Sequence, residues 1–281
     1  MNKLFYILTA AILFFGCYDK EKLEPSIIEN DFAVEDSSDP IDHYRYEIYS
    51  KYNTKIMFEY DTIFYRWSTK FYQKGLKYTE QKDRKALEEG VNFLKDNFIS
   101  KYSEEMKKIL PPYILLSESI EFTNSYSGKT SHWITSYGIS HICLGEVRLG
   151  LKDLKTEDPE TFRELVVSLH TRFFRRYLLQ NEIITIPDEF YSYSKIYYGE
   201  WYLGAPNGMR PDIGFLKLNS WGDAPSESSD VLSYLTTIMD STDEELTELL
   251  ESYPMVRKKY NVLFKYFKSE YNFDLKVLLK E

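Results

Sequence analysis

The stretch DPETFRELVVSLHTRFFRRYLLQ, residues 158–180, carries the clearest structural pattern in the chain. Asp158 can cap a helix, and Pro159 suits the first helical turn. Apolar side chains then recur at helical spacing and fall on one face; they are Phe162, Leu165, Val166, Leu169, Phe173 and Tyr177. The sequence therefore predicts an amphipathic helix that begins at Pro159.

Further helices are expected on both sides of this one. Helical apolar spacing marks residues 41–49, 80–99, 230–240 and 243–253. The run from Thr242 to Glu245 fits a capping box for the helix that follows it. A last helix is marked by Val256, Tyr260, Leu263, Phe264 and Phe267.

Strands and one long loop complete the expected organisation. Residues 54–67 are rich in β-branched and aromatic side chains and favour a strand. Residues 113–122 and 132–147 resemble two more strands with a Ser/Gly turn between them. Gly and Pro spread over residues 187–229 predict a long irregular segment, which is often functional.

The composition is that of a globular chain with an acidic balance. The 281 residues are 43% hydrophobic and 28% charged, with a formal net charge of −9 and an isoelectric point near 5.2. A nucleic-acid-binding protein would normally show a basic face, so we expect no nucleic-acid partner. The two cysteines, Cys17 and Cys143, exclude a disulfide scaffold. No phosphate-binding loop, dinucleotide fingerprint or Gly-x-Ser-x-Gly elbow is present.

The first residues, MNKLFYILTAAILFFG, have the pattern of a secretory signal peptide. The apolar run from Leu4 to Phe15 is too short to span a bilayer. Its end, Phe14-Phe15-Gly16-Cys17, resembles a bacterial lipobox, in which a small residue precedes the lipidated cysteine. An ordinary signal peptide with an incidental cysteine is the alternative.

These features predict three segments. Residues 1–16 would be a lipoprotein signal peptide, and residues 17–40 a flexible tether that carries lipid, including palmitate, on Cys17. Residues 41–281 would form a single folded domain. The charged run from Tyr18 to Lys22 resembles the signals that send Bacteroidota lipoproteins to the outer face of the outer membrane.

Candidate metal ligands are sparse, because the chain has only four histidines. His132, His141 and Cys143 fall in one predicted strand region, and the last two would share a face. A catalytic metal takes three protein ligands and an open position, and no second cluster completes this set. Packing is the expected role of a lone Cys143. Glu118 and Glu121 could pair, but the sequence does not give the separation that glycosidase chemistry requires.

Aromatic residues are abundant, with 25 Tyr, 18 Phe and 4 Trp. They are dense in residues 188–203 and 219–223, within the predicted irregular segment. Core packing is the common role of such side chains, whereas exposed rings bind peptides or sugars and anchor interfaces. Tyr198, Trp201 and Trp221 are the candidates for a binding surface.

Several sequence blocks occur in the order found in one family. They are residues 40–67, with YSKYN at 49–53 and YRW at 65–67; LPPYILL at 110–116; IPDEF at 186–190 followed by Tyr198 and Trp201; and Gly214-Phe215 followed by SDVLS at 229–233. In these blocks the chain resembles the substrate import-associated zinc metallohydrolase lipoproteins of Bacteroidota, which occur beside TonB-dependent transporters of the SusC/SusD type. The resemblance implies a zincin-like α+β domain with a small mixed sheet and several helices.

The predicted helix departs from this family at the metal motif. Active members carry His-Glu-x-x-His, in which two imidazoles bind zinc and the glutamate activates water. In the register without a gap, Arg172 and Arg176 take the ligand positions and Phe173 takes the position of the base. Arginine keeps its proton at ordinary pH and cannot bind zinc.

A second register does not restore the motif. There, His170 keeps one ligand position, but Thr171 replaces the base and Phe174 replaces the second ligand. The glutamate of the family's later acidic block falls on Ser229 or Ser233. The resemblance therefore implies a pseudoenzyme with no metal, no cofactor and no catalytic residue.

Two environments remain open for the arginines. At about 100° per residue, Arg176 lies within the apolar stripe and Arg172 at its edge. A buried guanidinium needs a carboxylate partner or a wet pocket. The candidate partners are Asp212, Asp223, Glu227 and Asp230. Alternatively, both side chains extend along a surface helix to solvent.

The expected function follows from the resemblance. It implies a lipid-anchored outer-membrane protein facing the cell exterior, which serves a TonB-dependent transporter and a SusD-like lipoprotein without catalysis. A peptide or a glycan is the expected ligand. One alternative is an active zinc metallohydrolase with atypical ligands, such as His170 with carboxylates from residues 212–230. The other is an envelope structural or adhesion lipoprotein unrelated to import.

The lipid anchor can be tested at its acceptor residue. Replacing Cys17 with Ser should move the protein from the membrane fraction to the soluble fraction, because the acceptor thiol is lost. Fractionation followed by immunoblotting measures the change. Cys143→Ser is the matched control and should stay in the membrane fraction, and unchanged partitioning of Cys17→Ser would contradict the anchor.

Overall fold

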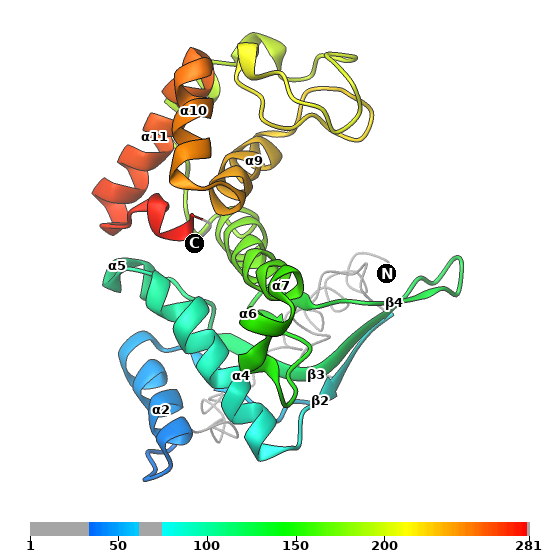
Figure 1. The fold of residues 1–281 in the computed structure, drawn as a ribbon, viewed down its shortest axis with the longest axis vertical. Coiled ribbons are helices and arrows are strands. Elements are labelled where there is room, and N and C mark those ends of the chain that lie inside the picture. Colours follow the sequence, from blue (N-terminus) through cyan, green and yellow to red (C-terminus); the bar gives the residue numbers. More distant parts are fainter. Residues whose placement is uncertain (1–33, 62–74, 280–281) are drawn as a thin grey trace, which may run out of the picture. The chain divides into compact units, whose positions relative to one another are not determined.

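The computed structural model describes residues 34–61 and 75–279, and its sheet is organised around one long strand, β3 (Tyr113–Thr123) (Figure 1). The first part of β3 lies between two parallel strands, β1 (Lys55–Met57) and β6 (His141–Leu144). The second part pairs antiparallel with β2 (Leu76–Glu80) and β4 (Thr130–His132). Strand β5 (Thr135–Tyr137) pairs antiparallel with β6. The sheet is mixed and the fold is α+β, as the family resemblance implies.

The residues of β3 explain its central position. From Ile114 to Ser117 every residue is buried, as expected for a strand whose two faces are both covered. Ile114 and Leu116 belong to the main core, whereas Leu115 belongs to a second cluster on the other face.

Two helices that precede β3 in the chain begin at capped positions. Helix α2 (Pro40–Tyr52) is capped by Asp39, and α4 (Arg84–Asn97) is capped by Asp83. Both agree with the helices expected at 41–49 and 80–99. Two short helices follow α4, namely η2 (Ile99–Lys101) and α5 (Glu104–Lys107).

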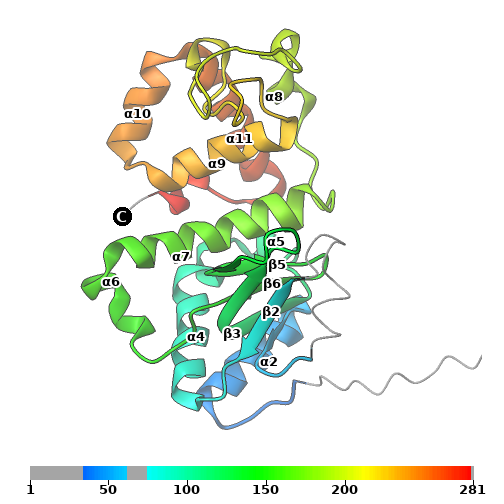
Figure 2. The ribbon, with the colours of Figure 1, turned by 90° about the vertical axis from the view of Figure 1, so that its right-hand side faces the viewer.

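A long central helix follows the short helices η3 (Leu151–Asp153) and α6 (Leu154–Glu157). It begins as α7 (Pro159–Thr171), where the Asp158 side chain accepts a hydrogen bond of 3.1 Å from the amide of Thr161. It continues without a break as a π-helix, η4 (Arg172–Leu179). This combined helix contacts β5 and β6 on one side and α9 (Glu227–Asp240) on the other, so it lies between the sheet and the carboxyl-terminal helices (Figure 2).

The remaining helices agree with the expected pattern. Helix α10 (Asp243–Ser252) has the predicted capping box, formed by Thr242 and Glu245. Helix α11 (Pro254–Tyr271) and the short η7 (Leu275–Leu278) complete the described chain. Within residues 34–61 and 75–279, none of the helices has the length and apolar character needed to cross a membrane.

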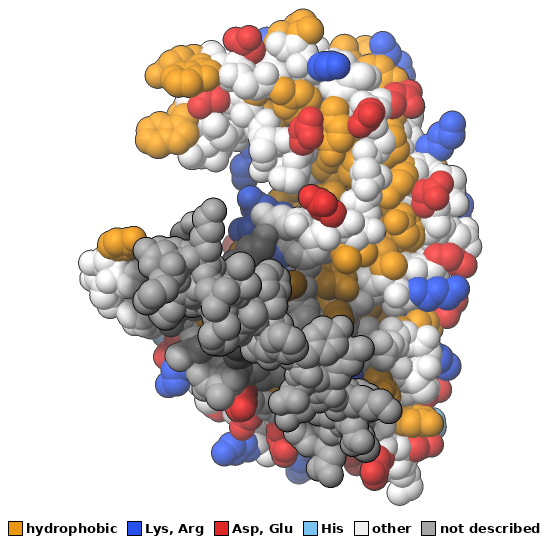
Figure 3. Space-filling view, turned by 180° about the vertical axis from the view of Figure 1, so that it is seen from behind, with side chains coloured by type: hydrophobic (Ala, Val, Ile, Leu, Met, Phe, Trp, Pro, Cys, Tyr) orange, Lys and Arg blue, Asp and Glu red, His pale blue; other side chains and the backbone are white. Residues whose placement is uncertain are grey.

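The segment predicted to be irregular contains only short helices, α8 (Asp188–Ser192), η5 (Lys195–Tyr197) and η6 (Pro211–Ile213). Its turns are closed internally: the amide of Gly204 donates to the carbonyl of Gly222 at 3.2 Å. The amide of Tyr202 donates to Asp223 Oδ1 at 3.0 Å. Hydrophobic side chains project over this segment in the space-filling view (Figure 3).

Two of the strand predictions were wrong in extent. Of residues 54–61, only Lys55–Met57 form a strand, and residues 62–67 lie outside the described part. Residues 132–147 form the end of β4 and two further short strands, because the chain reverses after β5. The amide of Gly138 closes that turn by donating to the carbonyl of His141 at 2.8 Å. The signal peptide, Cys17 and most of the predicted tether also lie outside the described residues.

Candidate functional site

His170 is enclosed in the core, with 2% of its surface exposed. Its Nε2 lies 3.1 Å from the carbonyl oxygen of Asn97, and its Nδ1 lies 2.5 Å from the hydroxyl of Tyr102. Because a carbonyl oxygen can only accept, we assign the proton to Nε2, and Nδ1 accepts from Tyr102. Burial lowers the pKa of His170 to about 3. Both ring nitrogens are therefore occupied by protein groups.

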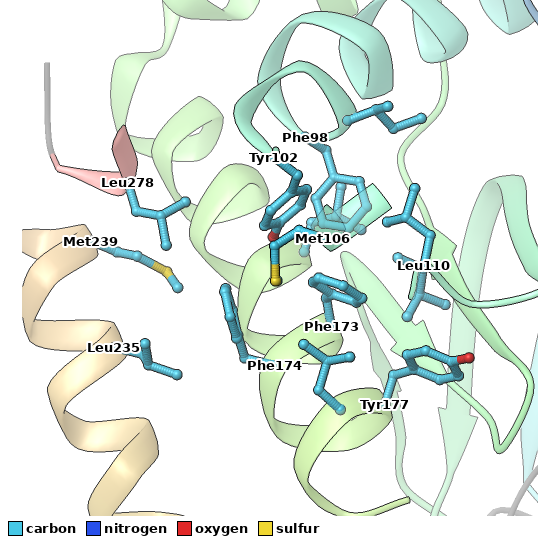
Figure 4. Packing of buried hydrophobic residues seen from close by; sticks show 14 of the residues in the cluster. Phe98, Tyr102, Met106, Leu110, Phe173, Phe174, Tyr177, Leu235, Met239 and Leu278 are labelled. Atoms are coloured by element: carbon cyan, nitrogen blue, oxygen red, sulfur yellow. The ribbon is translucent and has the colours of Figure 1, made fainter. Parts of the chain in front are cut away.

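The two phenylalanines that follow are core residues (Figure 4). Phe173 packs against Tyr102 with ring centroids 5.0 Å apart, and Phe174 packs against Phe267 at 5.8 Å. Both side chains are fully buried. Thr171, the last residue of α7, is half-buried. None of these three side chains offers a metal ligand of the kind that zinc takes in proteins.

The motif positions therefore do not fit zinc in either register. In the described ranges, no group of three His, Cys, Asp or Glu side chains could hold a metal ion. His141 is buried, with Nε2 3.1 Å from the Tyr78 hydroxyl, and burial lowers its pKa to about 3. Cys143 is buried in the second cluster, as packing predicts, whereas His132 is exposed on β4.

Arg172 and Arg176 are half-buried and share one aromatic neighbour, Tyr137 of β5. Their Cζ atoms lie 5.4 and 4.6 Å from the centroid of that ring. Arg172 Nε donates to Thr135 Oγ1 at 3.2 Å, and Arg176 Nη1 donates to Gln180 Oε1 at 3.1 Å. Both side chains thus lie between the two environments left open by the sequence: they are half-buried, and a ring and a polar group contact each guanidinium.

The predicted carboxylate partners of the two arginines are wrong. Asp212 pairs with Arg210 at 2.7 Å, and Asp223 accepts from the Tyr202 amide and from Asn219 Nδ2. Asp230 pairs with Lys259. Glu227 lies in the first turn of α9, where a helix favours a negative charge. Each predicted partner thus has a local role away from the two arginines.

The pair of Lys259 and Asp230 was not anticipated, and both side chains are 0% exposed. Asp230 Oδ2 also accepts from the Tyr198 hydroxyl, and Lys259 Nζ donates to Ser194 Oγ at 3.3 Å. Burial lowers the pKa of Lys259 and raises that of Asp230. Four aromatic rings surround Nζ at centroid distances of 4.4, 5.1, 5.4 and 5.8 Å; they belong to Phe190, Phe215, Tyr234 and Tyr198.

This pair is a structural centre, because no atom of either side chain is open to a ligand. A signal for it was present in the sequence. Lys259 falls between Val256 and Leu263, at helical spacing within the apolar stripe of α11. A lysine at such a position requires a buried acceptor.

The aromatic candidates divide into two groups. Tyr198 is half-buried and belongs to the environment of Lys259. Trp201 and Trp221 are 75% and 74% exposed, and the neighbouring Tyr202 is 81% exposed. The hydrogen bonds from Tyr202 to Asp223 and from Gly204 to Gly222 bring the two ends of this loop together. All three rings are exposed on this closed loop, and we call them together the exposed aromatic surface.

Comparison with known proteins does not assign this chain to a family. No family model matches the sequence, and no curated protein matches it. Among solved structures, the chain is similar to a protein from Bacteroides caccae that was provisionally assigned as a zinc-binding metallo-peptidase. The identity is 15%, the match covers 88% of this chain and 92% of that chain, and the TM-score is 0.41. A similarity of this size does not define a family.

The buried ion pair predicts a strong coupling between two positions. Lys259→Met should lower the free energy of unfolding by about 3–5 kcal/mol, because Asp230 loses its partner in a buried site. The double variant Lys259→Met/Asp230→Leu should regain much of that loss, since no buried charge remains. Urea unfolding of both single variants and the double variant measures the coupling. Strictly additive losses would contradict it.

The buried histidines predict an acid-dependent loss of stability. Their pKa values are about 3 in the folded chain and about 6.5 when unfolded, so only the unfolded chain gains protons between these values. Their contribution is complete above about pH 6.5 and declines as the pH falls toward 3. At pH 5 the loss should be about 2 kcal/mol for each histidine.

Urea unfolding at pH 7 and pH 5 tests this expectation. His170→Gln should show a smaller difference in unfolding free energy between the two pH values than the unmodified chain. His132→Gln changes an exposed histidine in the same way and should leave the difference intact. Equal pH dependence in all three proteins would refute the assignment.

Proposed function

We propose that this chain is a non-catalytic binding lipoprotein of the outer-membrane surface. Its metallopeptidase-like domain would act as an accessory subunit of a TonB-dependent nutrient importer of the SusC/SusD type. The observation that carries the non-catalytic part is the chemistry at the motif positions. Guanidinium groups, phenyl rings and a fully hydrogen-bonded histidine cannot bind zinc and activate water. The importer and the outer-membrane location rest on the resemblance of the sequence blocks.

The exposed aromatic surface supports a binding role. Trp201, Tyr202 and Trp221 keep most of their surface in solvent on a loop closed by its own hydrogen bonds. Rings of this kind stack on sugars and anchor protein contacts at a low entropic cost, because their side chains have few rotatable bonds. A glycan or a peptide is the proposed ligand of this surface.

The alternatives are less well supported. A metallohydrolase built on His170 and the carboxylates of residues 212–230 would need groups that already bond to other partners. His170 is bonded to Tyr102 and Asn97, and Asp230 to Lys259. An envelope structural or adhesion lipoprotein shares the aromatic surface, so a transporter partner separates it from the proposed function.

Two measurements test the proposal. The first is metal content: residues 18–281 are purified without chelator or nickel affinity, incubated with excess zinc, desalted and analysed by mass spectrometry. We expect far less than one zinc per chain. Near-stoichiometric zinc would overturn the non-catalytic assignment, and His170→Gln, His141→Gln and His132→Gln would then locate the site.

The second measurement addresses the partner. The full-length chain, tagged at its carboxyl terminus, is purified in detergent from the membranes of its own bacterium. A TonB-dependent transporter and a SusD-like lipoprotein should co-purify and should be absent when an unrelated tagged lipoprotein is used. Recovery of the chain without a transporter would contradict the importer role and favour the adhesion alternative.

A further inference from the structure

Three arginines of the π-helix form a cationic cluster, which comprises Arg172, Arg175 and Arg176. All three side chains are half-buried. Arg175 Nε and Arg176 Nε are inaccessible to solvent and have no hydrogen-bond partner in the described structure. The hydrogen bonds of these guanidinium groups within the described residues are those to Thr135 and Gln180. Each guanidinium has five N–H groups, so most donors of the cluster have no acceptor among the described residues of the protein.

The positive charge of the cluster is not compensated within the described chain. Among the described residues, no carboxylate forms an ion pair with any of the three side chains. Two of the predicted partners, Asp212 and Asp230, pair with Arg210 and Lys259. Burial, followed by the charge of Arg176, lowers the pKa values of Arg172 and Arg175. Arginine nevertheless stays protonated at neutral pH. The chain as a whole has a formal charge of −9, so the cluster is a positively charged region of an acidic protein.

The helix geometry keeps these arginines together on one side. In η4 the burial pattern repeats every fourth residue: Phe173, Phe174, Tyr177 and Leu178 are buried, whereas Arg172, Arg175, Arg176 and Leu179 are half-buried. A repeat of four is too long for an α-helix and suits the wider π-helix, in which the Gln180 amide bonds to the Arg175 carbonyl at 3.1 Å. π-helical turns are rare and occur often at functional sites.

The three arginines are only half-buried, so part of each residue lies at the molecular surface. Seen from behind, Lys and Arg side chains are visible at the inner end of a hollow beside the projecting hydrophobic side chains (Figure 3). Tyr137 lies under two guanidinium groups, and Trp133 lies 5.9 Å from the Cζ atom of Arg172. These rings fix the planar groups in place, so a ligand would meet donors whose orientation is already set.

We propose that the cluster of Arg172, Arg175 and Arg176 binds an oxyanion group that carries two or more negative charges. The inference rests on the proposed binding function, because it names the chemistry of a ligand at the motif helix. Guanidinium forks bind both carboxylates and phosphates through paired N–H donors. The source of the group is therefore either a polycarboxylate or a phosphate, and the two differ in shape.

Binding of small anions to residues 18–281 tests the proposal. This segment contains the whole compact unit of residues 34–281. Sodium phosphate and sodium citrate are titrated separately by calorimetry at constant ionic strength, with sodium chloride as the reference salt. At least one of the two anions should bind saturably, with one site per chain. Tighter binding of citrate would identify a carboxylate ligand, and tighter binding of phosphate a phosphate ligand.

Charge-neutral variants locate the site. Arg172→Gln and Arg176→Gln should each weaken anion binding at least tenfold. Arg175→Gln should weaken anion binding too. It should disturb the fold least of the three variants, because no ring contact or hydrogen bond of the Arg175 side chain is present in the described structure. Without anion and at low salt, Arg175→Gln should also raise the melting temperature, since it removes repulsion. Arg257→Gln removes an exposed arginine from α11 and should bind like the unmodified chain.

The outcomes separate this inference from the proposed function. Absence of saturable binding, or equal binding by the unmodified chain and all three cluster variants, would overturn the anion site. Co-purification with a transporter could still succeed in that case, and the proposed function would stand. Conversely, anion binding lost in the cluster variants would support this inference even if no transporter were recovered.

Discussion

The central helix is buried on two sides, and this constraint shapes the rest of the molecule. Phe173 faces the packing around Phe98 and Tyr102, whereas Phe174 faces Phe267 of α11. Each of these rings would cost about 3–5 kcal/mol if truncated to alanine. A helix with two apolar faces leaves only a narrow polar sector. The arginines occupy that sector, and His170 is drawn into the core, where its ring nitrogens bond to protein groups.

A second centre connects the carboxyl-terminal helices to the irregular segment. Lys259 of α11 reaches Asp230 of α9 and Ser194 of the irregular segment that precedes α9, inside a set of aromatic rings. Such a pair stabilises little compared with apolar side chains of similar volume, because both charges are desolvated. It does strongly disfavour arrangements in which one charge is buried alone. The aromatic loop that follows Tyr198 is thereby fixed at its base, which positions Trp201 and Trp221 without burying them.

Short-range sequence patterns predicted the helix caps and several of the helices. The caps at Asp158 and Thr242 and the apolar spacing of α4, α7 and α11 are contained in short windows of sequence, and the structure confirms them. Residues 132–147 form short strands because the chain turns between β5 and β6, and the residue composition did not predict that turn. The Lys259–Asp230 pair joins positions far apart in the chain, so no periodicity could select Asp230 among the many carboxylates. In the sequence, the sign of the π-helix is that large apolar residues recur every four positions between Phe173 and Leu178. An analysis that assumes 3.6 residues per turn does not separate this repeat from an α-helix.

Under the proposed function, the motif helix would have lost catalysis and kept a preference for anionic ligands. A zinc ion in a peptidase has two electrostatic effects: it lowers the pKa of bound water, and it attracts the oxygen atoms of a substrate. Guanidinium groups cannot reproduce the first effect, because they have no coordination position for water. They do reproduce the second, because their N–H donors present positive charge to oxygen in a partly desolvated site. Replacing imidazole ligands by arginines at one helix face would thus remove hydrolysis and retain recognition, and under the proposed function recognition is the activity that an importer requires.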